Sequence, residues 1–335
     1  MTPLTTKDYN KINSGEIMTN DALYLINLIE QQKTNNEICE ILNITPKQLA
    51  TRLTNLKNKG FFFKRRYFSN GELLYFPIKK PNQIKDLKKN NSSIIYTSHQ
   101  DTSLKVLLIS DLHFGSSKQR LDLINEAFNY CIKNDIHLIF CCGDIIDGTF
   151  SQSEQLISIP YKQTEFFLKN YPSEKNIFTF SVTGDHDSSA LQNHIHQDIS
   201  EIINNYRHDI IMVMDNEHHI NIKNDELTLY HKLPQDYFKE STIYLCGHMH
   251  NYSCKLINNQ LIISVPSLSN IKTEIPSMIE MNLLFHEGLI NSINLKQLLF
   301  LEKLLLISEN NYTFLVNNSR RTSIANEEEI KVKKL

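Results

Sequence analysis

Apolar runs that stop at Asp, His or Gly recur through the middle of the chain. The first run begins at Leu104 and ends at Asp111-Leu112-His113, and its nearly continuous apolar character is typical of a strand buried on both faces. Later runs cover 137–142, 178–183, 227–230 and 243–246, and helical patterns cover 119–134 and 154–169. Strands that alternate with helices predict an α/β fold with parallel strands.

Each of these runs ends in residues that can hold a metal or move a proton. In order, the ends supply Asp111 and His113, then Asp144 and Asp147, then Asp185, His186 and Asp187, then His231, and finally His248 and His250. In an open α/β sheet, ligands bind at the carboxyl edge of the strands. Mixed carboxylate and imidazole groups at that edge suit divalent Mn²⁺, Fe²⁺, Zn²⁺ or Mg²⁺.

These blocks resemble the calcineurin-like metallophosphoesterases, whose motifs run D-x-H, G-D-x-x-D, G-N-H-[D/E], a lone His, and G-H-x-H. The resemblance covers about residues 104–270 and keeps the family's order. It implies a four-layer α/β/β/α sandwich and a metal-dependent phosphoesterase. It also implies two divalent metal ions, with Mn²⁺ as the first candidate, which clamp a phosphate between them.

Carried over position by position, the resemblance assigns roles to ten residues. One metal would be held by Asp111, His113 and His250, the other by Asp185, His231 and His248, with Asp144 bridging both. His186 would be the general acid that protonates the leaving oxygen. Asp147 would hydrogen-bond that imidazole, and Asp187 would organise the site from behind. Turn capping is the alternative for the two aspartates.

One position departs from the usual family pattern, and a second differs from one branch of the superfamily. Asp185 stands where most members have Asn, so the ligating oxygen is kept, an amide donor is lost and a negative charge is added. The phosphoprotein phosphatases also carry an Arg after G-D-x-x-D, where this chain has Gly148-Thr149. The absence of this Arg favours phosphodiesterase or nuclease chemistry. The charge of Asp185 leaves open the alternative that catalysis is weakened or lost.

A different pattern fills residues 20–80. Helical stripes with capping boxes at Thr34 and Thr45 predict three short helices, and Asn70-Gly71 predicts a hairpin after them. This order resembles a winged helix-turn-helix domain. From 47 to 89 the sequence has twelve Lys or Arg against Glu72 and Asp86, which indicates DNA binding. The expected contacts are Lys47, Arg52, Lys57, Lys59, Lys64, Arg65 and Arg66. A dimerisation or protein-docking module is the alternative.

The predicted organisation is a loose N-terminus (1–19), the winged helix (20–80), a linker (81–103), the phosphoesterase domain (104–305) and a mobile tail (306–335). Residues 278–305 predict edge strands or a last helix. Six Cys without C-x-x-C spacing, and no signal peptide, indicate a reduced, cytoplasmic protein. No apolar run reaches the roughly 18 residues of a membrane span.

The sequence therefore predicts a metal-dependent phosphodiesterase that acts on DNA or a nucleotide and is targeted by its winged helix. Two alternatives stay open. One is a DNA-binding regulator or docking protein whose phosphoesterase-like domain has lost turnover, and the other is a phosphomonoesterase. The substrate, the metal, the polarity of any nuclease action and the oligomeric state, including a dimer, are not fixed by the sequence.

Overall fold

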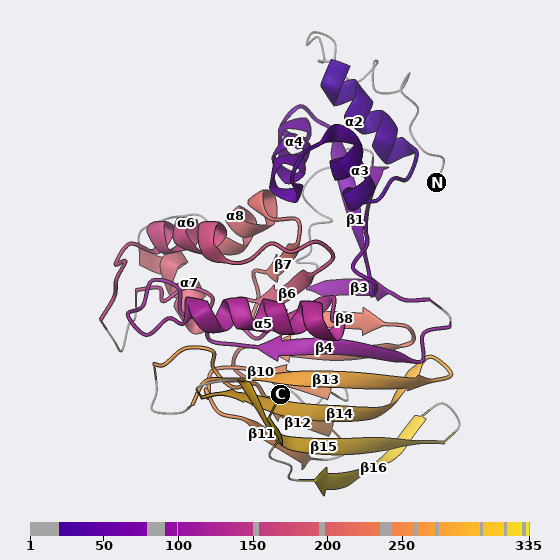
Figure 1. Ribbon diagram of the computed structural model, residues 1–335, viewed down its shortest axis with the longest axis vertical. Coiled ribbons are helices and arrows are strands. Elements are labelled where there is room, and N and C mark those ends of the chain that lie inside the picture. Colours follow the sequence, from indigo (N-terminus) through magenta and orange to yellow (C-terminus); the bar gives the residue numbers. More distant parts are fainter. Residues whose placement is uncertain are drawn as a thin grey trace.

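The computed structural model describes residues 20–78, 91–98, 100–149, 154–193, 198–234, 243–257, 260–271, 275–301, 304–317, 320–329 and 333–334. Two large mixed sheets face each other, and helices cover one of them (Figure 1). The expected loose N-terminus, 1–19, lies outside the described residues. No helix within the described ranges is long and apolar enough to cross a membrane.

The helix-covered sheet contains the strand on which the site is built. Its parallel part is β4 (Ser103–Ile109), β5 (Leu138–Cys141), β6 (Phe178–Val182) and β7 (Ile210–Val213). In β4, Val106 and Leu108 point into the core between the sheets, whereas Leu107 and Ile109 pack against the helices. Burial on both faces explains why this strand reads as an unbroken apolar run.

Helices α5 (Leu121–Asn134), α6 (Pro160–Asn170) and α8 (Ile199–Tyr206) form the outer layer of this sheet, and α7 (Asp185–Asn193) follows β6. The antiparallel part is β13 (Ser277–His286), β14 (Leu289–Phe300), β15 (Leu304–Asn317) and β16 (Arg320–Glu329), and a short strand, β17 (Lys333–Lys334), pairs with β15. The described residues between 278 and 305 thus form strands and turns rather than a last helix. Most of the expected mobile tail is also strand. Edge strands commonly carry polar and charged residues. Their polar sequence therefore predicted a mobile tail instead of strands.

The second sheet has the strand order β11 (Ser253–Ile257), β12 (Gln260–Ser264), β10 (Ile243–Cys246), β9 (Asp225–Tyr230), β8 (Glu217–Ile222), β3 (Ser92–Tyr96), β1 (Phe62–Phe68) and β2 (Leu73–Ile78). On β8, His218, Ile220 and Ile222 are buried, while Glu217 and His219 are partly exposed. The apolar cluster on the outer face holds four strand residues and no helix residue among those described. The helical fourth layer predicted for this face is therefore not seen in that part of the chain.

The N-terminal region forms the three predicted helices, α2 (Asn20–Glu30), α3 (Asn35–Leu42) and α4 (Pro46–Asn58), followed by the β1–β2 hairpin. Both predicted capping boxes are present. The Thr34 hydroxyl accepts from the Glu37 backbone N–H, the Thr45 hydroxyl accepts from that of Gln48, and each N3 side chain accepts from the cap residue's N–H. Gly71 closes the hairpin with φ +77. We call residues 20–78 the N-terminal module.

The N-terminal module is joined to the rest of the protein rather than hung from a linker. Residues 92–96, within the stretch expected to be a linker, form β3, which pairs in parallel with β1 at Tyr67↔Ile95 and with β8 at Ser93↔Ile220. The strand is short and flanked by polar residues, so it gave no periodic signal. The ring of Tyr67 packs edge-on against Phe178 and Phe180, with centroids 5.2 and 5.5 Å away.

Helix α4 also packs directly on α8. The Thr54 hydroxyl donates to the carbonyl oxygen of Asn205 at 2.8 Å, and the Lys57 ammonium donates to the Asn205 side chain at 3.3 Å. The Tyr67 hydroxyl donates to the carbonyl oxygen of His208 at 3.2 Å. Figure 1 shows this module stacked at one end of the molecule, above α8 and β3. Its orientation relative to the sheets is therefore set by packing and hydrogen bonds on two sides.

Candidate metal centre

The register of the strands brings the predicted site residues to one edge. Ile109 lies beside Cys141, and Cys141 beside Ser181, so β4, β5 and β6 end at the same level. In the second sheet Tyr230 lies beside Cys246. The residues that follow these strand ends, Asp111, Asp144, Asp185, His231 and His248, therefore start from neighbouring positions.

Five of the seven predicted metal ligands have a left-handed backbone. The φ angles are 54° at Asp111, 48° at His113, 52° at Asp144, 66° at His248 and 65° at His250. A non-glycine residue in such a conformation costs about 1–3 kcal/mol and persists only where its surroundings hold it. Here the Asp111 N–H donates to the Gly143 carbonyl, and the His113 N–H donates to the Asp144 carbonyl, both at 3.0 Å.

Three glycines leave room for these side chains. A Cβ at Gly184 would lie 2.0 Å from Asp144 Oδ1, and one at Gly247 would lie 2.2 Å from the Ser110 hydroxyl. At Gly143, where φ is +91, a Cβ would lie 2.9 Å from His231 Nδ1. The glycine in each G-D or G-H block thus allows the close approach of backbone and ligand side chains.

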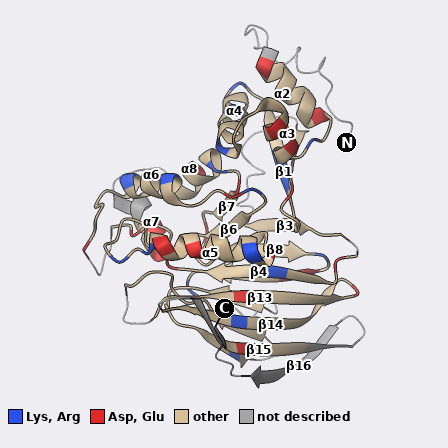
Figure 2. Ribbon diagram, viewed as in Figure 1, with Lys and Arg blue, Asp and Glu red and all other residues tan. Residues whose placement is uncertain are grey.

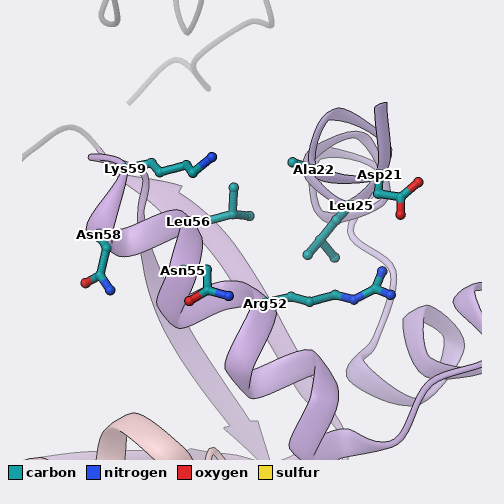
Figure 3. Close-up of a pocket in the computed structure, with 8 residues that line it drawn as sticks. All are labelled: Asp21, Ala22, Leu25, Arg52, Asn55, Leu56, Asn58 and Lys59. Carbon is teal, nitrogen blue, oxygen red and sulfur yellow. The ribbon is translucent and has the colours of Figure 1, made fainter. Parts of the chain in front are cut away.

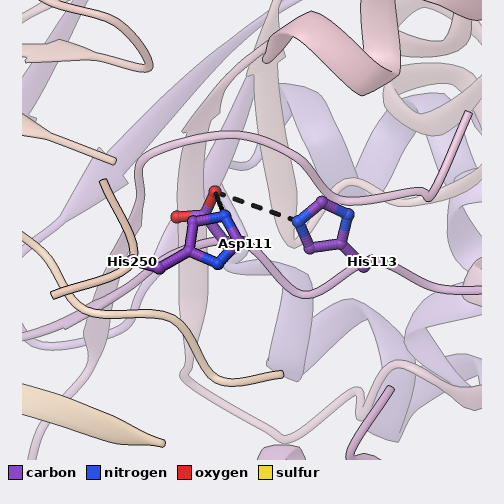
Figure 4. A group of neighbouring side chains, drawn as sticks. All are labelled: Asp111, His113 and His250. Carbon is purple, nitrogen blue, oxygen red and sulfur yellow. Dashed lines mark ion pairs between the residues drawn. The ribbon is translucent and has the colours of Figure 1, made fainter. Parts of the chain in front are cut away.

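The first group of side chains that could share a cation is Asp111, His113 and His250 (Figure 4). His250 Nε2 lies 3.2 Å from Asp111 Oδ1, and His113 Nε2 lies 4.0 Å from the same oxygen. All three side chains are buried. Figure 4 shows both imidazoles directed at the Asp111 carboxylate.

The second group is Asp185, His231 and His248. His248 Nδ1 lies 3.6 Å from Asp185 Oδ2. Asp144 connects the two groups, because its Oδ2 lies 3.2 Å from His231 Nε2 and 3.9 Å from His113 Nε2. The structure thus places all seven residues predicted as metal ligands in one continuous cluster.

The cluster fits a divalent cation. Both ring nitrogens of His113 and both carboxylate oxygens of Asp111 are buried without a hydrogen-bond partner in the described part of the chain, an arrangement that is costly unless an ion satisfies them. His231 Nδ1 donates to the Cys142 carbonyl at 2.8 Å, which leaves Nε2 directed at Asp144. A backbone acceptor behind a ligating imidazole is common at metal sites.

The electrostatics of the cluster also favour a cation. Burial lowers the pKa of His231, but the Asp144 carboxylate outweighs burial and raises it to about 10. Burial and the repulsion of Asp144 raise the pKa of the Asp187 carboxyl to about 6. Several carboxylates held out of water attract any available positive charge, and a divalent ion supplies more of it than a protonated imidazole.

The surroundings of His186 differ from those expected. Its Nδ1 donates to the backbone carbonyl of Asp147 at 2.7 Å, and not to the Asp147 carboxylate. That carboxylate instead lies 3.4 Å from His113 Nδ1 and accepts from the Gln155 side chain at 2.8 Å. The turn after β5 therefore holds the His186 imidazole through its carbonyl and places its carboxylate beside the His113 imidazole without a hydrogen bond. The His186 ring packs edge-on against that of His113, with centroids 4.6 Å apart.

Asp187 fastens two loops of the site together. Its carboxylate accepts from the backbone N–H groups of Ile145, Ile146 and Gly184, at 3.2, 2.9 and 2.9 Å. These groups belong to the turns after β5 and β6, and the first of these turns carries Asp144. The side chain is fully buried, so it positions the site and does not touch a substrate.

Sequence reasoning missed two groups that complete the site. The Gln155 side chain holds the Asp147 carboxylate. The Ser267 hydroxyl donates to the carbonyl oxygen of Asp111 at 3.0 Å from the loop after β12. Neither residue sits at a motif or at a recognisable spacing, so no signal in the sequence marks them.

The seven cations predicted to contact DNA do not form one surface. The Lys47 ammonium donates to the Leu168 carbonyl at 3.4 Å, and Lys57 is turned to α8. Arg66 stacks on the ring of Phe76, 4.2 Å from its centroid, and Lys64 is exposed. Figure 2 shows basic residues on α4 and acidic ones on α2 and α3.

Of the remaining predicted cations, one on α4 and one directly after it line a pocket. Arg52 and Lys59 extend from α4 toward α2 across a pocket of about 520 Å³ whose apolar lining includes Leu25 and Leu56 (Figure 3). Arg65, on β1, lies at the junction with α8. We call Arg52 and Lys59 the outward set. Lys47, Lys57 and Arg65 instead lie at the junction with the rest of the protein.

Solved structures to which the chain is similar include an archaeal phosphodiesterase, with 14% sequence identity over 59% of this chain and 100% of that chain (TM-score 0.40). Vps29 from Cryptosporidium parvum has 16% identity over 69% and 100% (TM-score 0.37). The phosphoesterase Yfce from E. coli has 15% identity over 57% and 91% (TM-score 0.38). No functionally curated protein matches the chain in sequence.

The family comparison covers the strands that build the metal centre. Residues 104–263 match the calcineurin-like phosphoesterase family. This range begins at β4 and ends in β12, so it includes Asp111, Asp144, Asp185, His231 and His250. The match extends over both sheets but not over the N-terminal module. Residues 104–263 thus form a calcineurin-like phosphoesterase domain.

Proposed function

We propose that the chain is a dinuclear-metal-dependent phosphodiesterase that acts on DNA or a nucleotide. The observation that carries the proposal is the convergence of seven carboxylate and imidazole side chains in overlapping groups whose candidate ligand atoms lie within 4.8 Å of one another. In this proposal Asp111, His113 and His250 hold one ion, Asp185, His231 and His248 the other, and Asp144 lies between them. Manganese is the first candidate, and Fe²⁺, Zn²⁺ and Mg²⁺ are the others, because the donors are oxygen and nitrogen only.

Bound cations would supply Lewis acidity for the phosphate and for an attacking water. The water loses one proton to solvent as its oxygen bonds to phosphorus, the P–O bond to the leaving group breaks, and His186 gives its proton to the leaving alkoxide and regains one from solvent. Its Nδ1 is held by the Asp147 carbonyl, so Nε2 is the nitrogen left to donate. The Asp147 carboxylate and the Asp187 carboxylate act by holding His113 and the loops in position.

Gly148 supports the preference for a diester. Its φ is +62, and a Cβ there would lie 2.1 Å from the His186 carbonyl oxygen, so no side chain fits. The guanidinium that phosphatases of this superfamily place after G-D-x-x-D therefore has no equivalent at this position. A diester carries one negative charge less than a monoester dianion and needs less compensation.

The proposal is tested by comparing bis(p-nitrophenyl) phosphate with p-nitrophenyl phosphate in the presence of Mn²⁺. We expect the diester to be hydrolysed with the higher kcat/KM. Hydrolysis of the monoester alone would favour a phosphomonoesterase, and no product from either would favour a docking protein or regulator.

Asp185 favours the docking protein or regulator as the second candidate. Its half-exposed carboxylate adds a charge that the usual Asn would not. Two like charges 4 Å apart repel by about 4 kcal/mol at an effective dielectric of 20, before bound cations offset the repulsion. In a phosphoesterase this charge opposes an incoming phosphate.

We therefore expect Asp185→Asn to raise kcat/KM for the diester by about tenfold, because Asn keeps the ligating oxygen, removes the charge and adds a donor. The same change should weaken metal binding, which a chelator titration measures. Asp122→Asn, at an exposed carboxylate paired with Arg120, is the control and should change neither value. Unchanged turnover in Asp185→Asn would show that repulsion between the Asp185 carboxylate and the phosphate does not limit the reaction.

The N-terminal module is proposed to be a winged helix that binds DNA through α4 and the outward set. Arg52, Asn55 and Asn58 lie on that helix, Lys59 directly follows it, and all four line one pocket (Figure 3). Cations of this kind contact phosphates, and amide side chains can read base edges.

Replacing Arg52 and Lys59 together by Gln should weaken binding to duplex DNA by about tenfold and reduce its dependence on salt, because each phosphate contact releases counterions. Fluorescence anisotropy at two salt concentrations measures both effects. The control is Lys133→Gln together with Lys169→Gln, which removes the same charge from α5 and α6. Equal losses in the two double variants would mean that binding is not localised on α4.

A further inference from the structure

The junction between the N-terminal module and the phosphoesterase domain encloses a small pocket with a basic lining. Its volume is about 140 Å³, and it lies between α4, β1, β2 and the end of α8. The ionisable residues that line it are Lys57, Arg65, Tyr75 and His208, and no carboxylate of the described residues does so. Lys57 and Arg65 come from the module, whereas His208 comes from the phosphoesterase domain.

The Arg65 guanidinium, which hydrogen-bonds the Tyr67 side chain, has one nitrogen without an acceptor in the part of the chain that the structure describes. Arg65 Nη1 is shielded from solvent and has no hydrogen-bond partner among the described residues. A buried guanidinium N–H without an acceptor costs free energy, and such groups are normally satisfied by a carboxylate, a carbonyl, a water or an anion. The Asp209 carboxylate binds Arg207 through both its oxygens, at 2.8 and 2.6 Å, and makes no hydrogen bond to Arg65 Nη1.

The electrostatics around His208 agree with an excess of positive charge. Burial lowers the pKa of His208 well below its usual 6.5, and the charges of Arg65 and Lys57 lower it further. The Tyr75 hydroxyl lies 3.1 Å from His208 Nδ1, so this imidazole already has a neutral partner. Two cations that face a common cavity repel each other unless an anion lies between them.

From this geometry we infer that the junction pocket binds a tetrahedral oxyanion of the phosphate class, held by Arg65 and Lys57. The volume of about 140 Å³ leaves room for an ion of five heavy atoms. Arg65 supplies planar N–H donors that match the oxygens of such an ion. The inference does not depend on the proposed function.

A bound oxyanion would bridge the two parts of the chain. Thr54 and Lys57 already tie α4 to Asn205, and the ion would add charge-assisted bonds on the same side. Because the ion binds the docked arrangement and not the unfolded chain, it should raise the thermal stability of the whole protein.

The test measures the thermal unfolding of the full chain in 10 mM inorganic phosphate and in chloride at equal ionic strength, with EDTA to keep cations from the metal centre. We expect phosphate to raise the midpoint by about 2–4 °C. Arg65→Gln and Lys57→Gln should each remove most of this increment. Lys64→Gln is the matched control, because it makes the same charge change one residue away, on an exposed side chain.

Comparing the increment within each variant separates ion binding from any loss of stability caused by the substitution itself. Equal increments in Arg65→Gln and Lys64→Gln, or no increment in the parent protein, would overturn the inference. A second arm titrates duplex DNA into the same variants. If Arg65→Gln weakened DNA binding tenfold and left the phosphate increment intact, the junction cations would belong to a DNA surface, which would also overturn it.

Discussion

Asp144→Asn is expected to lower diester hydrolysis by at least about a thousandfold, because one side chain lies between both groups of metal ligands. Its Oδ2 is 3.2 Å from His231 Nε2, and it shares a group with Asp111. An amide is a weaker ligand than a carboxylate and cannot neutralise a second cation. Elemental analysis should show that the bound metal falls from two ions to one or none.

The fold should survive this substitution. The backbone N–H of His186 donates to Asp144 Oδ1 at 2.9 Å, and the amide oxygen of Asn can still accept this hydrogen bond. The side-chain volume is also unchanged. Asp135→Asn is the control. The backbone of Asp135 is also left-handed, with φ 55, and its side chain is exposed at the end of α5. Retention of two metals and more than a tenth of the activity in Asp144→Asn would contradict the proposed bridging role.

Gly184→Ala is expected to disable the site without changing any ligand. The new Cβ would lie 2.0 Å from Asp144 Oδ1 and 2.5 Å from the Asp144 nitrogen, so the carboxylate and its backbone must move. Overpacking of this kind costs about 1–3 kcal/mol. Displacing a catalytic group by about 1 Å can lower the rate by about a hundredfold.

Urea unfolding and diester turnover measure the two effects of Gly184→Ala. Gly288→Ala is the comparison, because its Cβ would meet the side-chain nitrogen of Asn224 at 2.5 Å, at a hairpin far from the metal centre, and φ there is +82. It should lose stability and keep activity. If Gly184→Ala kept full turnover, Asp144 would not need the position that the structure gives it.

The parts of the fold that local patterns specify could be predicted from the sequence. The apolar run of β4 predicted burial on both faces, which is confirmed by Val106 and Leu107 packing on opposite sides. The capping boxes at Thr34 and Thr45 are present as expected. The ends of the strands could be placed at one edge because parallel strands of similar length finish together.

The parts that depend on tertiary packing could not be predicted. Strand β3 has only five residues and gains its stability from β1 and β8, so its own sequence carries no signal. The carbonyl of Asp147, rather than its carboxylate, holds His186 because the backbone turns after β5, and side-chain type does not encode that turn. The position of Gln155 beside Asp147 depends on a loop without periodicity.

The union of the hairpin with the second sheet has a geometric consequence. The contacts with β3 and α8 fix the orientation of the N-terminal module relative to the metal centre. If α4 binds a nucleic acid as proposed, the nucleic-acid strand must run from α4 to the metal centre over a fixed distance and in a fixed direction. The number of nucleotides between the binding site and the cleavage site would then be determined by the fold.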